Sequence, residues 1–247
     1  MLNGGIFLDL AGKKILIAED EEMLAEVIGE EFEFRGAEVK IAHHGIDALG
    51  LLKQFKPDVI LSDYRMPKMN GKEFLSQARK VTAQDTPFVF LSAFGDISME
   101  DVYDCGADAF VSKPCNMNDL TQIIHYYMQG RFQRWQQFDE ATVKSKVKQT
   151  LVRDFGAEWK KKIRFGMNGF FLGEVVPSLK SGDFFEFKLT LNEPGSQPCQ
   201  IDGLAQCRFM LSHGIGAEIL FVRGGQTRID QIKKVIPMCV QRIPNSL

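Results

Sequence analysis

Four short apolar runs, each followed by a polar side chain, constrain the fold of this chain more than any other feature. They occupy residues 14–18, 58–62, 88–91 and 109–112. The run at 58–62 is rich in β-branched residues and lies between Pro57 and Pro67, which is typical of a fully buried parallel strand. The polar side chains that follow the runs are Glu19, Asp20, Asp63, Ser92 and Lys113. Because functional groups of an open α/β sheet gather outside the carboxyl ends of its strands, we expect these side chains to share one pocket.

Three of the expected pocket residues are acids, which sets the chemistry of the pocket. Glu19, Asp20 and Asp63 would repel one another unless a cation lay between them. An all-oxygen ligand set favours a hard ion, so the pattern predicts a Mg²⁺ site. The alternative is that these carboxylates simply face water, but complementary chemistry at four strand ends favours a site.

The residues around the expected pocket resemble a known family. The loop after Asp63 contains Met66-Pro67 and Gly71, Ser92 is followed by Ala93, and Lys113 is followed by Pro114. Together with the acidic pair, these residues follow one another in the order found in the receiver domains of two-component response regulators. The resemblance covers about residues 12–130, roughly half the chain.

The resemblance implies a role for each residue of the pocket. Asp63 would accept a phosphoryl group from a histidine kinase or a phosphotransfer protein. The Mg²⁺ ion would be bound by Glu19, Asp20, Asp63 and the backbone carbonyl of Arg65. Ser92 and Lys113 would contact the phosphoryl oxygens, and Ser92 and Phe110 would form the switch that responds to phosphorylation.

The resemblance also implies a flavodoxin-like α/β fold. Its parallel sheet would have five strands in the order 2-1-3-4-5, and the Lys113–Pro114 peptide bond would be cis. A further strand is expected at 39–42, and helices at 45–55, 71–81, 97–105 and 116–128, the last capped by Asn116 or Asn118. Helical spacing predicts that the first helix buries Met23, Leu24, Val27, Ile28 and Phe32 and exposes its glutamates.

Net charge divides the chain into two unlike halves. Residues 1–130 contain 12 Lys and Arg against 21 Asp and Glu, a net charge of −9, whereas residues 131–247 contain 18 against 11, a net charge of +7. Together with the resemblance to receiver domains, which covers about residues 12–130, this difference leads us to expect a receiver domain at 12–130, a helical linker at 131–142 and a second domain at 143–241. The segment 131–155 is interpreted as mainly helical, either as a linker or as a dimer seam.

The second half is rich in strands. Apolar or alternating segments predict strands at 170–172, 184–191, 205–211 and 216–222, with a terminal helix at about 226–240. An antiparallel barrel of about six strands fits the spacing of the turn signals.

This half resembles a PilZ domain, the family that binds cyclic di-GMP. The resemblance rests on segments 169–172, 181–183 and 214–221. The ligand motifs are eroded, because Arg164, Gly166 and Gly169 stand where the family has Asp or Asn, Ser, and Gly, and only Lys144 and Lys148 stand where it has paired arginines. Lysine lacks the planar fork that grips phosphate and guanine, so we favour loss of nucleotide binding.

Three functions from different classes remain open. The first is a phosphorylation-controlled regulator whose second domain binds another protein. The second also responds to cyclic di-GMP, and the third is a DNA-binding transcription factor, which is disfavoured because strands occupy most of residues 168–222. The second half has no convergent acid, base and nucleophile, so we expect no enzyme. Five cysteines without C-x-x-C spacing, no apolar run long enough to span a membrane and no basic leader predict a cytoplasmic protein.

Overall fold

The computed structural model describes residues 8–82, 86–93, 105–129, 134, 138–165, 169–192 and 197–224. The chain forms two compact units, Met1–Gly130 and Arg131–Leu247. No helix within the described ranges is both long and apolar enough to cross a membrane. The expected terminal helix at 226–240 lies outside these ranges, as does nearly all of the expected helix at 97–105.

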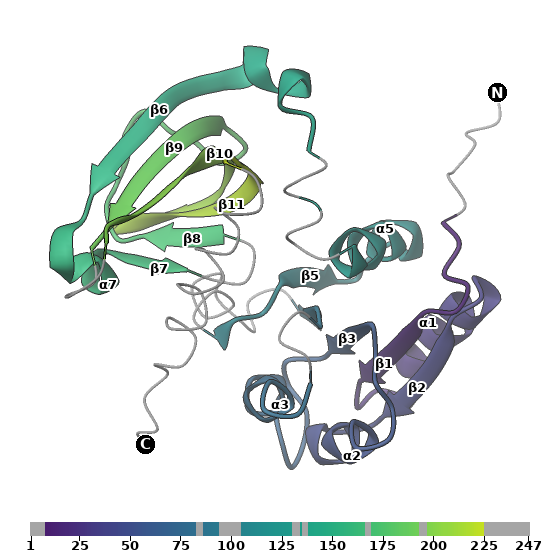
Figure 1. Cartoon of the computed structure of the whole chain (residues 1–247). Helices are drawn as coiled ribbons and strands as arrows, with labels where there is room; N and C mark the ends of the chain where they lie inside the picture. The colour runs from purple at the N-terminus through teal and green to yellow at the C-terminus, as the bar shows by residue number, and fades with distance from the viewer. Residues whose placement is uncertain are drawn as a thin grey trace, which may run out of the picture. The chain divides into compact units, whose positions relative to one another are not determined.

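The first unit is built on a five-stranded parallel sheet (Figure 1). Its strands are β1 (Lys14–Ala18), β2 (Glu38–Ala42), β3 (Val59–Ser62), β4 (Phe88–Ala93) and β5 (Ala109–Lys113). They lie in the order β2-β1-β3-β4-β5, as the family resemblance implied. All four expected apolar runs are strands, and most of their residues are buried because helices cover both faces of the sheet.

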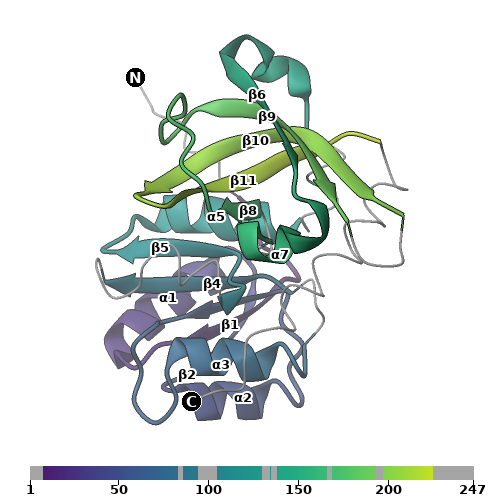
Figure 2. The same cartoon turned by 90° about the vertical axis from the view of Figure 1, so that its left-hand side faces the viewer.

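Helices cover the two faces of this sheet in pairs. The described helices of this unit are α1 (Glu22–Phe34), α2 (Gly45–Leu51), α3 (Gly71–Ala78) and α5 (Met117–Met128). Phe32 of α1 and Ile124 of α5 share one apolar core, whereas Ala48 of α2 and Phe74 of α3 share the other. Figure 2 shows α2 and α3 together on one side of the sheet. The unit is therefore a three-layer α/β domain.

Two helices end earlier than predicted, and the structure shows which of the two expected residues caps the start of α5. α2 ends at Leu51 and α3 at Ala78, where the chain continues in turns. Of the two expected caps of α5, Asn116 is the one used, since its side chain accepts hydrogen bonds from the backbone N–H groups of Asn118 and Asp119. The side-chain oxygen of Asn116 thereby accepts hydrogen bonds from backbone N–H groups that have no partner within the helix.

The buried face of α1 differs from the prediction. Ala25, Ile28, Gly29 and Phe32 face the core, while Met23 is 77% exposed and Val27 is 57% exposed. The predicted face was rotated because large apolar residues were assumed to point inward. The small residues Ala25 and Gly29 instead allow the helix to approach the sheet, where an added methyl group on Gly29 would lie 3.0 Å from the Ile41 side chain. Met23 and Val27 are therefore a surface feature.

Within its described residues, the second unit contains six strands, and short helical turns precede the first strand and connect it to the second. Its elements are η1 (Glu140–Thr142), η2 (Lys144–Lys146), β6 (Val147–Asp154), η3 (Gly156–Glu158), α7 (Trp159–Lys162), β7 (Ile163–Phe165), β8 (Gly169–Leu172), β9 (Phe184–Leu191), β10 (Cys199–Leu211) and β11 (Gly214–Val222). The four strands predicted in this half are all found. β10 begins earlier than predicted, at Cys199, because its first half pairs with β9.

Residues 138–155 are not mainly helical, which corrects the sequence-based interpretation for this part of the segment 131–155, whereas residues 131–133 and 135–137 of the expected helical linker lie outside the described ranges. Residues 147–154 form β6, and residues 140–146 contain only two short 3₁₀ turns. Val147, Thr150 and Val152 are β-branched and favour a strand. Alternate residues of β6 lie against the apolar core, with Leu151 3% exposed, so pairing with β9 prevails over the weak helical periodicity.

The six strands form one mixed sheet in the order β6-β9-β10-β11-β8-β7. The expected sheet was entirely antiparallel, but β6 pairs with β9 in parallel. A parallel pair needs a long crossover, and here it includes η3, α7, β7 and β8. Among the described residues no pairing joins β6 to β7, so the predicted closed barrel is not established by the strand order. Figure 2 shows that the long strands β9, β10 and β11 are strongly curved.

The concave side of this sheet holds an aromatic core. Phe170 lies at its centre, with its ring centroid 5.4 Å from Phe187 and 6.3 Å from Phe185. Trp159 of α7 is 1% exposed and packs edge-on against Phe165. Edge-to-face contacts of this kind add to the stabilisation gained by burying the rings. The second unit therefore has a hydrophobic core of its own.

An ion-pair network ties the first turns of the second unit to its sheet. Arg223, just after β11, donates a hydrogen bond to Glu186 of β9 at 2.7 Å and also pairs with Glu140 of η1. Thr150 of β6 donates to the other oxygen of Glu186 at 3.0 Å. The hydrogen bond from Arg223 is the main reason that the pKa of Glu186 lies below its usual value.

We expect Arg223→Ala to lower the free energy of unfolding by about 1 kcal/mol at neutral pH, a figure kept small because the pair is about one-third exposed. A lowered carboxyl pKa gives stability that is present above the unfolded-state pKa and is lost as the pH falls. The difference in the free energy of unfolding between Arg223→Ala and the parent protein should therefore become smaller at acidic pH. Urea unfolding at neutral and at acidic pH measures this difference, and Lys188→Ala on the same strand is the control. An equal difference at both pH values would contradict the stabilising role given to the pair of Arg223 with Glu186.

Candidate functional site

Asp63 lies directly after β3, at the carboxyl edge of the first sheet. Its backbone N–H donates to the carbonyl of Ala18 at 2.8 Å, which continues the pairing between β3 and β1. The N–H of Glu19 donates in the same way to Ala42 of β2. These hydrogen bonds hold the two acidic residues at one level of the sheet, as expected from the strand pattern.

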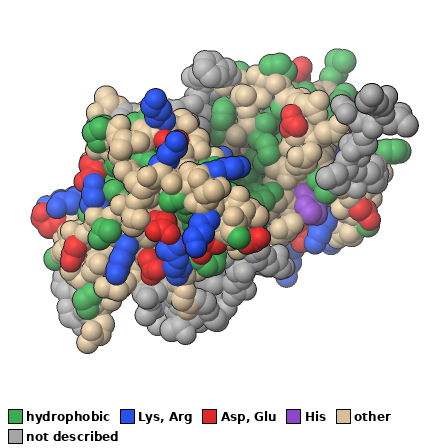
Figure 3. All heavy atoms as spheres, turned by 90° about the horizontal axis from the view of Figure 1, so that it is seen from above, with side chains coloured by type: hydrophobic (Ala, Val, Ile, Leu, Met, Phe, Trp, Pro, Cys, Tyr) green, Lys and Arg blue, Asp and Glu red, His purple; other side chains and the backbone are tan. Residues whose placement is uncertain are grey.

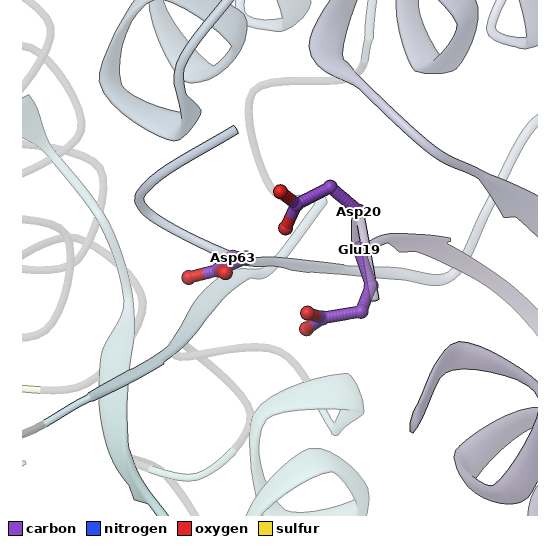
Figure 4. Close-up of side chains that lie close together, drawn as sticks. All are labelled: Glu19, Asp20 and Asp63. Carbon is purple, nitrogen blue, oxygen red and sulfur yellow. The ribbon is translucent and has the colours of Figure 1, made fainter. Parts of the chain in front are cut away.

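The acidic side chains converge at this edge (Figure 4). Glu19, Asp20 and Asp63 each place a carboxylate oxygen within 4.8 Å of the others. Glu19 is 1% exposed and Asp63 is 8% exposed, while Asp20 is open to solvent. The sequence-based expectation that these three carboxylates meet is therefore met in the structure.

Lys113 completes the cluster from the end of β5. Its Nζ lies 2.8 Å and 2.7 Å from the two oxygens of Glu19 and 3.2 Å from Oδ2 of Asp63. The backbone of Lys113 is positioned by the pairing of β5 with β4, in which Ala93 faces Lys113. The Lys113–Pro114 peptide bond is cis, as the resemblance implied.

Burial and charge shape the protonation of the cluster. Burial raises the pKa of Glu19 to about 7, and the hydrogen bonds and charge of Lys113 oppose this rise only in part. Burial also disfavours the charged form of Lys113, yet the two carboxylates outweigh this effect and raise its pKa. Lys113 therefore remains an ammonium ion, while Glu19 holds a proton more readily than an exposed carboxyl group.

The residues present fit a hard divalent cation. One ammonium ion faces three carboxylates, so the cluster carries excess negative charge when all three are ionised. Carboxylate oxygens from Glu19, Asp20 and Asp63 are the donor type that Mg²⁺ prefers. Arg65, expected to supply a backbone carbonyl, lies in the adjoining loop, and its N–H donates to Oδ1 of Asp63 at 3.3 Å.

The loop after Asp63 is held close to the strand edge. The N–H of Gly71 donates to the carbonyl of Tyr64 at 2.9 Å. Asn70 and Glu73 form a reciprocal capping box at the start of α3. A Cβ atom on Gly71 would lie 2.3 Å from the carbonyl oxygen of Asp63 and 2.9 Å from the Phe90 ring. Glycine at position 71 is thus required by the close approach of two backbone segments.

We expect Gly71→Ala to lower the free energy of unfolding by about 1–3 kcal/mol, because the added methyl group must displace the backbone of Asp63. The same displacement should weaken cation binding at the acidic cluster. Gly50→Ala in the second half of α2 is the matched control, because a Cβ atom there meets no atom within 4 Å. Denaturant unfolding and a magnesium titration compare the two variants. If Gly71→Ala and Gly50→Ala have the same free energy of unfolding, the loop accommodates the added methyl group without loss of stability and the prediction is wrong.

Ser92 and Phe110 lie where the strand pattern predicted, and their switch roles stay predictions. Ser92 is fully buried near the end of β4 and pairs in register with Ser112 of β5. Because Ser62 pairs with Phe90, Ser92 lies two residues further towards the edge that carries Asp63. Phe110 of β5 is partly buried against the core beneath α2 and α3.

One contact near the site was not predicted from the sequence. Lys68, in the loop after Asp63, has a positive φ of 65° and places its Nζ 2.7 Å from Nε2 of His44. His44 also caps α2 by accepting a hydrogen bond from the N–H of Asp47. No local sequence signal joins residues 44 and 68, because only the tertiary fold brings the two loops together.

The sheet order and the acidic edge define the first unit as a receiver-type α/β domain. Residues 15–125 match the family model described as the response regulator receiver domain. The first unit is therefore a response regulator receiver domain.

Curated relatives resemble part of the chain. The regulatory protein AtoC of Escherichia coli is 32% identical over 117 residues, covering 47% of this chain and 25% of that protein. The probable transcriptional regulator ycf29 of Pyropia yezoensis is 36% identical over 115 residues, covering 45% and 51%. The response regulator MprA of Mycobacterium avium is 32% identical over 108 residues, covering 43% and 47%. The chain thus spans between a quarter and about half of the length of these relatives.

Solved structures also resemble about half of the chain. The receiver domain of Francisella response regulator 1452 is 30% identical, with a TM-score of 0.43, and the match covers 48% of this chain and 98% of that one. The receiver domain of the Pseudomonas aeruginosa sensor histidine kinase PA1611, solved with a magnesium ion coordinated in its active site cleft, is 25% identical, with a TM-score of 0.45 and the same coverage.

Proposed function

We propose that this protein is a two-component response regulator that is phosphorylated on Asp63 by a histidine kinase or a phosphotransfer protein. The observation that carries the proposal is the buried carboxylate of Asp63 at the end of β3, beside two further acids and the ammonium group of Lys113. The match of residues 15–125 to the receiver family supports the same function.

The residues of the pocket divide the work of phosphoryl transfer. A carboxylate oxygen of Asp63 forms the new P–O bond as the P–N bond of a phosphohistidine breaks, and the departing imidazole nitrogen takes up a proton. Lys113 is already within 3.2 Å of Asp63 and would stabilise the transferred oxygens by its charge. Ser92 would donate a hydrogen bond to the same group.

Glu19, Asp20, Asp63 and the carbonyl of Arg65 would hold Mg²⁺. Bound there, the ion would neutralise charge that gathers on the phosphoryl oxygens. Phosphorylation adds charge and strong acceptor oxygens, which Ser92 and Lys113 would follow. Their movement, together with that of Phe110, is the proposed switch.

Mass spectrometry tests this function directly. The full chain is incubated with acetyl phosphate and Mg²⁺, digested at low temperature and mapped for an acyl phosphate. We expect one modified residue, Asp63, and none when Mg²⁺ is removed with a chelator. Modification at another residue, or equal modification without the metal, would contradict the proposal.

The second unit would carry the output by binding another protein. We propose no catalytic reaction beyond self-catalysed phosphotransfer and dephosphorylation, and we propose that the protein acts in the cytoplasm.

A PilZ-like response to cyclic di-GMP remains the alternative function. Lys148 borders a shallow pocket, whereas the Arg164 guanidinium packs on the Phe171 ring at 4.7 Å. Protein binding is favoured because lysines stand where the PilZ family has paired arginines and Arg164 stands where it has an acid or amide, and calorimetric titration with cyclic di-GMP distinguishes the two.

The exposed face of α1 is proposed as the docking surface for the phosphoryl donor. Met23, Val27 and Phe34 are 77%, 57% and 76% exposed, and their spacing places them on one side of the helix. Exposed apolar side chains that line up in this way mark an interaction site. The glutamates beside them, Glu22, Glu26, Glu30 and Glu33, favour a partner with basic groups around an apolar centre.

We expect the double substitution Met23→Ser and Val27→Ser to slow phosphotransfer from the cognate donor protein about tenfold or more, because truncating central apolar contacts costs over 1 kcal/mol each. Phosphorylation by acetyl phosphate should be unchanged, since it does not use the surface. Val81→Ser, at a 61% exposed apolar position elsewhere in this unit, is the control. A loss with both phosphoryl donors would assign the effect to the pocket instead.

A further inference from the structure

A shallow pocket of about 550 Å³ lies at the start of β6, in the second unit. Its lining residues come from two segments, Ser145, Lys146, Val147 and Lys148 on one side and Gly182, Asp183 and Phe184 on the other. Figure 3 looks down on the face of this unit that carries η2 and β6, where Lys and Arg side chains stand among acidic and polar ones. None of the residues expected to act in phosphotransfer belongs to this pocket.

The pocket forms where the ladder between β6 and β9 is interrupted. Val147 pairs with Phe184, and the next pair is Thr150 with Glu186, so β6 uses one residue more than β9 over this stretch. The extra residue breaks the regular pairing near Lys148 and spreads the two strands. Such irregularities re-aim side chains at the edges of sheets.

The wall opposite the lysines is held rigidly. Gly182 has a φ of +91°, and its N–H donates to the carbonyl of Cys207 at 2.8 Å. The Asp183 carboxylate accepts a hydrogen bond from the N–H of Lys180 at 2.9 Å. Asp183 is thus engaged within its own turn, which limits its use as a counter-ion for the lysines across the pocket.

The two lysines of the pocket are exposed and lack a counter-ion among the described residues. No ion pair within the described ranges involves Lys146 or Lys148. Neighbouring Lys144 lies close enough to Glu186 to lower the pKa of that carboxyl group. A ligand that brings negative charge to Lys146 and Lys148 would therefore meet two available ammonium groups.

The shape and composition of the pocket favour a protein partner over a small molecule. Small-molecule sites are mostly apolar and bury most of the ligand surface. This pocket is open, is lined largely by polar groups and has only Val147 and the half-buried Phe184 as apolar surface. Lysines are point charges without the planar fork that selects phosphate, so they suit carboxylates on a flexible segment equally well.

We propose that this pocket docks an acidic segment of a partner protein. Carboxylates of the segment pair with Lys146 and Lys148, and an apolar side chain rests on Phe184. The proposal deepens the suggested output by protein binding and rests on it, but it does not depend on phosphorylation of Asp63. It also predicts that β6, at the edge of the sheet, lies beside the bound segment.

The test is a titration of ¹⁵N-labelled full-length Asp63→Asn protein with a synthetic peptide of alternating Glu and Leu. Because this variant has no phosphoryl acceptor, failure of docking and failure of the phosphorylation proposal remain distinguishable. We expect amide shifts at 145–148 and 182–184 that saturate and weaken as salt is raised. When Lys146→Glu and Lys148→Glu are added to the Asp63→Asn protein, we expect the affinity for the peptide to fall about tenfold. The two lysines that attract the carboxylates of the peptide are then replaced by groups that repel them.

Adding Lys162→Glu and Lys188→Glu instead is the matched control, because it reverses two exposed positive charges of the same unit outside the pocket. Equal weakening of peptide binding by this control pair would reduce the effect to net charge and overturn the proposal. Shifts confined to other residues would also overturn it. A parallel titration with cyclic di-GMP and pyrophosphate covers the other ligand class: if these shift the pocket amides at lower concentration than the peptide, the site is a phosphate site and the docking proposal is wrong.

Discussion

Asp63→Asn should abolish phosphorylation of the protein by acetyl phosphate. The amide has no anionic oxygen to attack phosphorus, while the shape of the side chain is kept. Glu19 is not expected to replace Asp63, because it is fully buried and both its carboxylate oxygens are held by Lys113. Phosphoryl incorporation, measured by phosphate-affinity electrophoresis, should fall to the level seen without donor.

The same variant should lose every structural response to the phosphoryl group. Small-angle scattering of the parent protein with and without beryllofluoride and Mg²⁺ reports any change of shape, and we expect none in Asp63→Asn. Asp119→Asn, an exposed carboxylate in the first turn of α5, is the control and should behave as the parent protein. A scattering change that persists in Asp63→Asn would refute Asp63 as the switch residue.

Phe170→Ala should destabilise the second unit by about 3–5 kcal/mol, a large part of the 5–15 kcal/mol typical of a whole domain. Phe170 is fully buried, and its ring packs against Phe165 of β7 and against Phe185 and Phe187 of β9. Truncation therefore leaves a cavity that rigid neighbours from two other strands cannot easily fill.

The measurement is urea unfolding followed by tryptophan fluorescence, because Trp159 lies in the same core. Val152→Ala is the control: it also truncates a strand residue, but one that is 58% exposed, so a change within about 0.5 kcal/mol is expected. If both variants unfold at the same urea concentration, the aromatic cluster does not hold the second unit together.

The parallel sheet of the first unit could be read from the sequence because its signal is local. Each strand is a short β-branched or apolar run closed by a polar residue, and such runs are buried on both faces in only one common architecture. The same rule places Glu19, Asp63 and Lys113 at one edge of the sheet. The order of the strands came from family resemblance, and the structure confirmed it.

The errors arose where long-range packing overrides local pattern. Helical spacing assigned Met23 and Val27 to the core, but the sheet accepts the smaller Ala25 and Gly29 at close range. Residues 147–154 carry a weak helical periodicity, yet β9 offers a pairing edge that only the folded unit contains. In both cases the deciding partner is far away in the sequence.

By itself, then, the sequence determined the chemistry of this protein: three acids and one lysine at strand ends, and a change in net charge between the halves. Only the tertiary structure decided which residues are left on the surface, namely the exposed stripe of α1 and the open pocket at Lys146 and Lys148. It also decided the contact between Lys68 and the buried His44. The reason is physical. Burial and pairing are properties of the assembled neighbours, whereas residue type and spacing along a strand are properties of the chain.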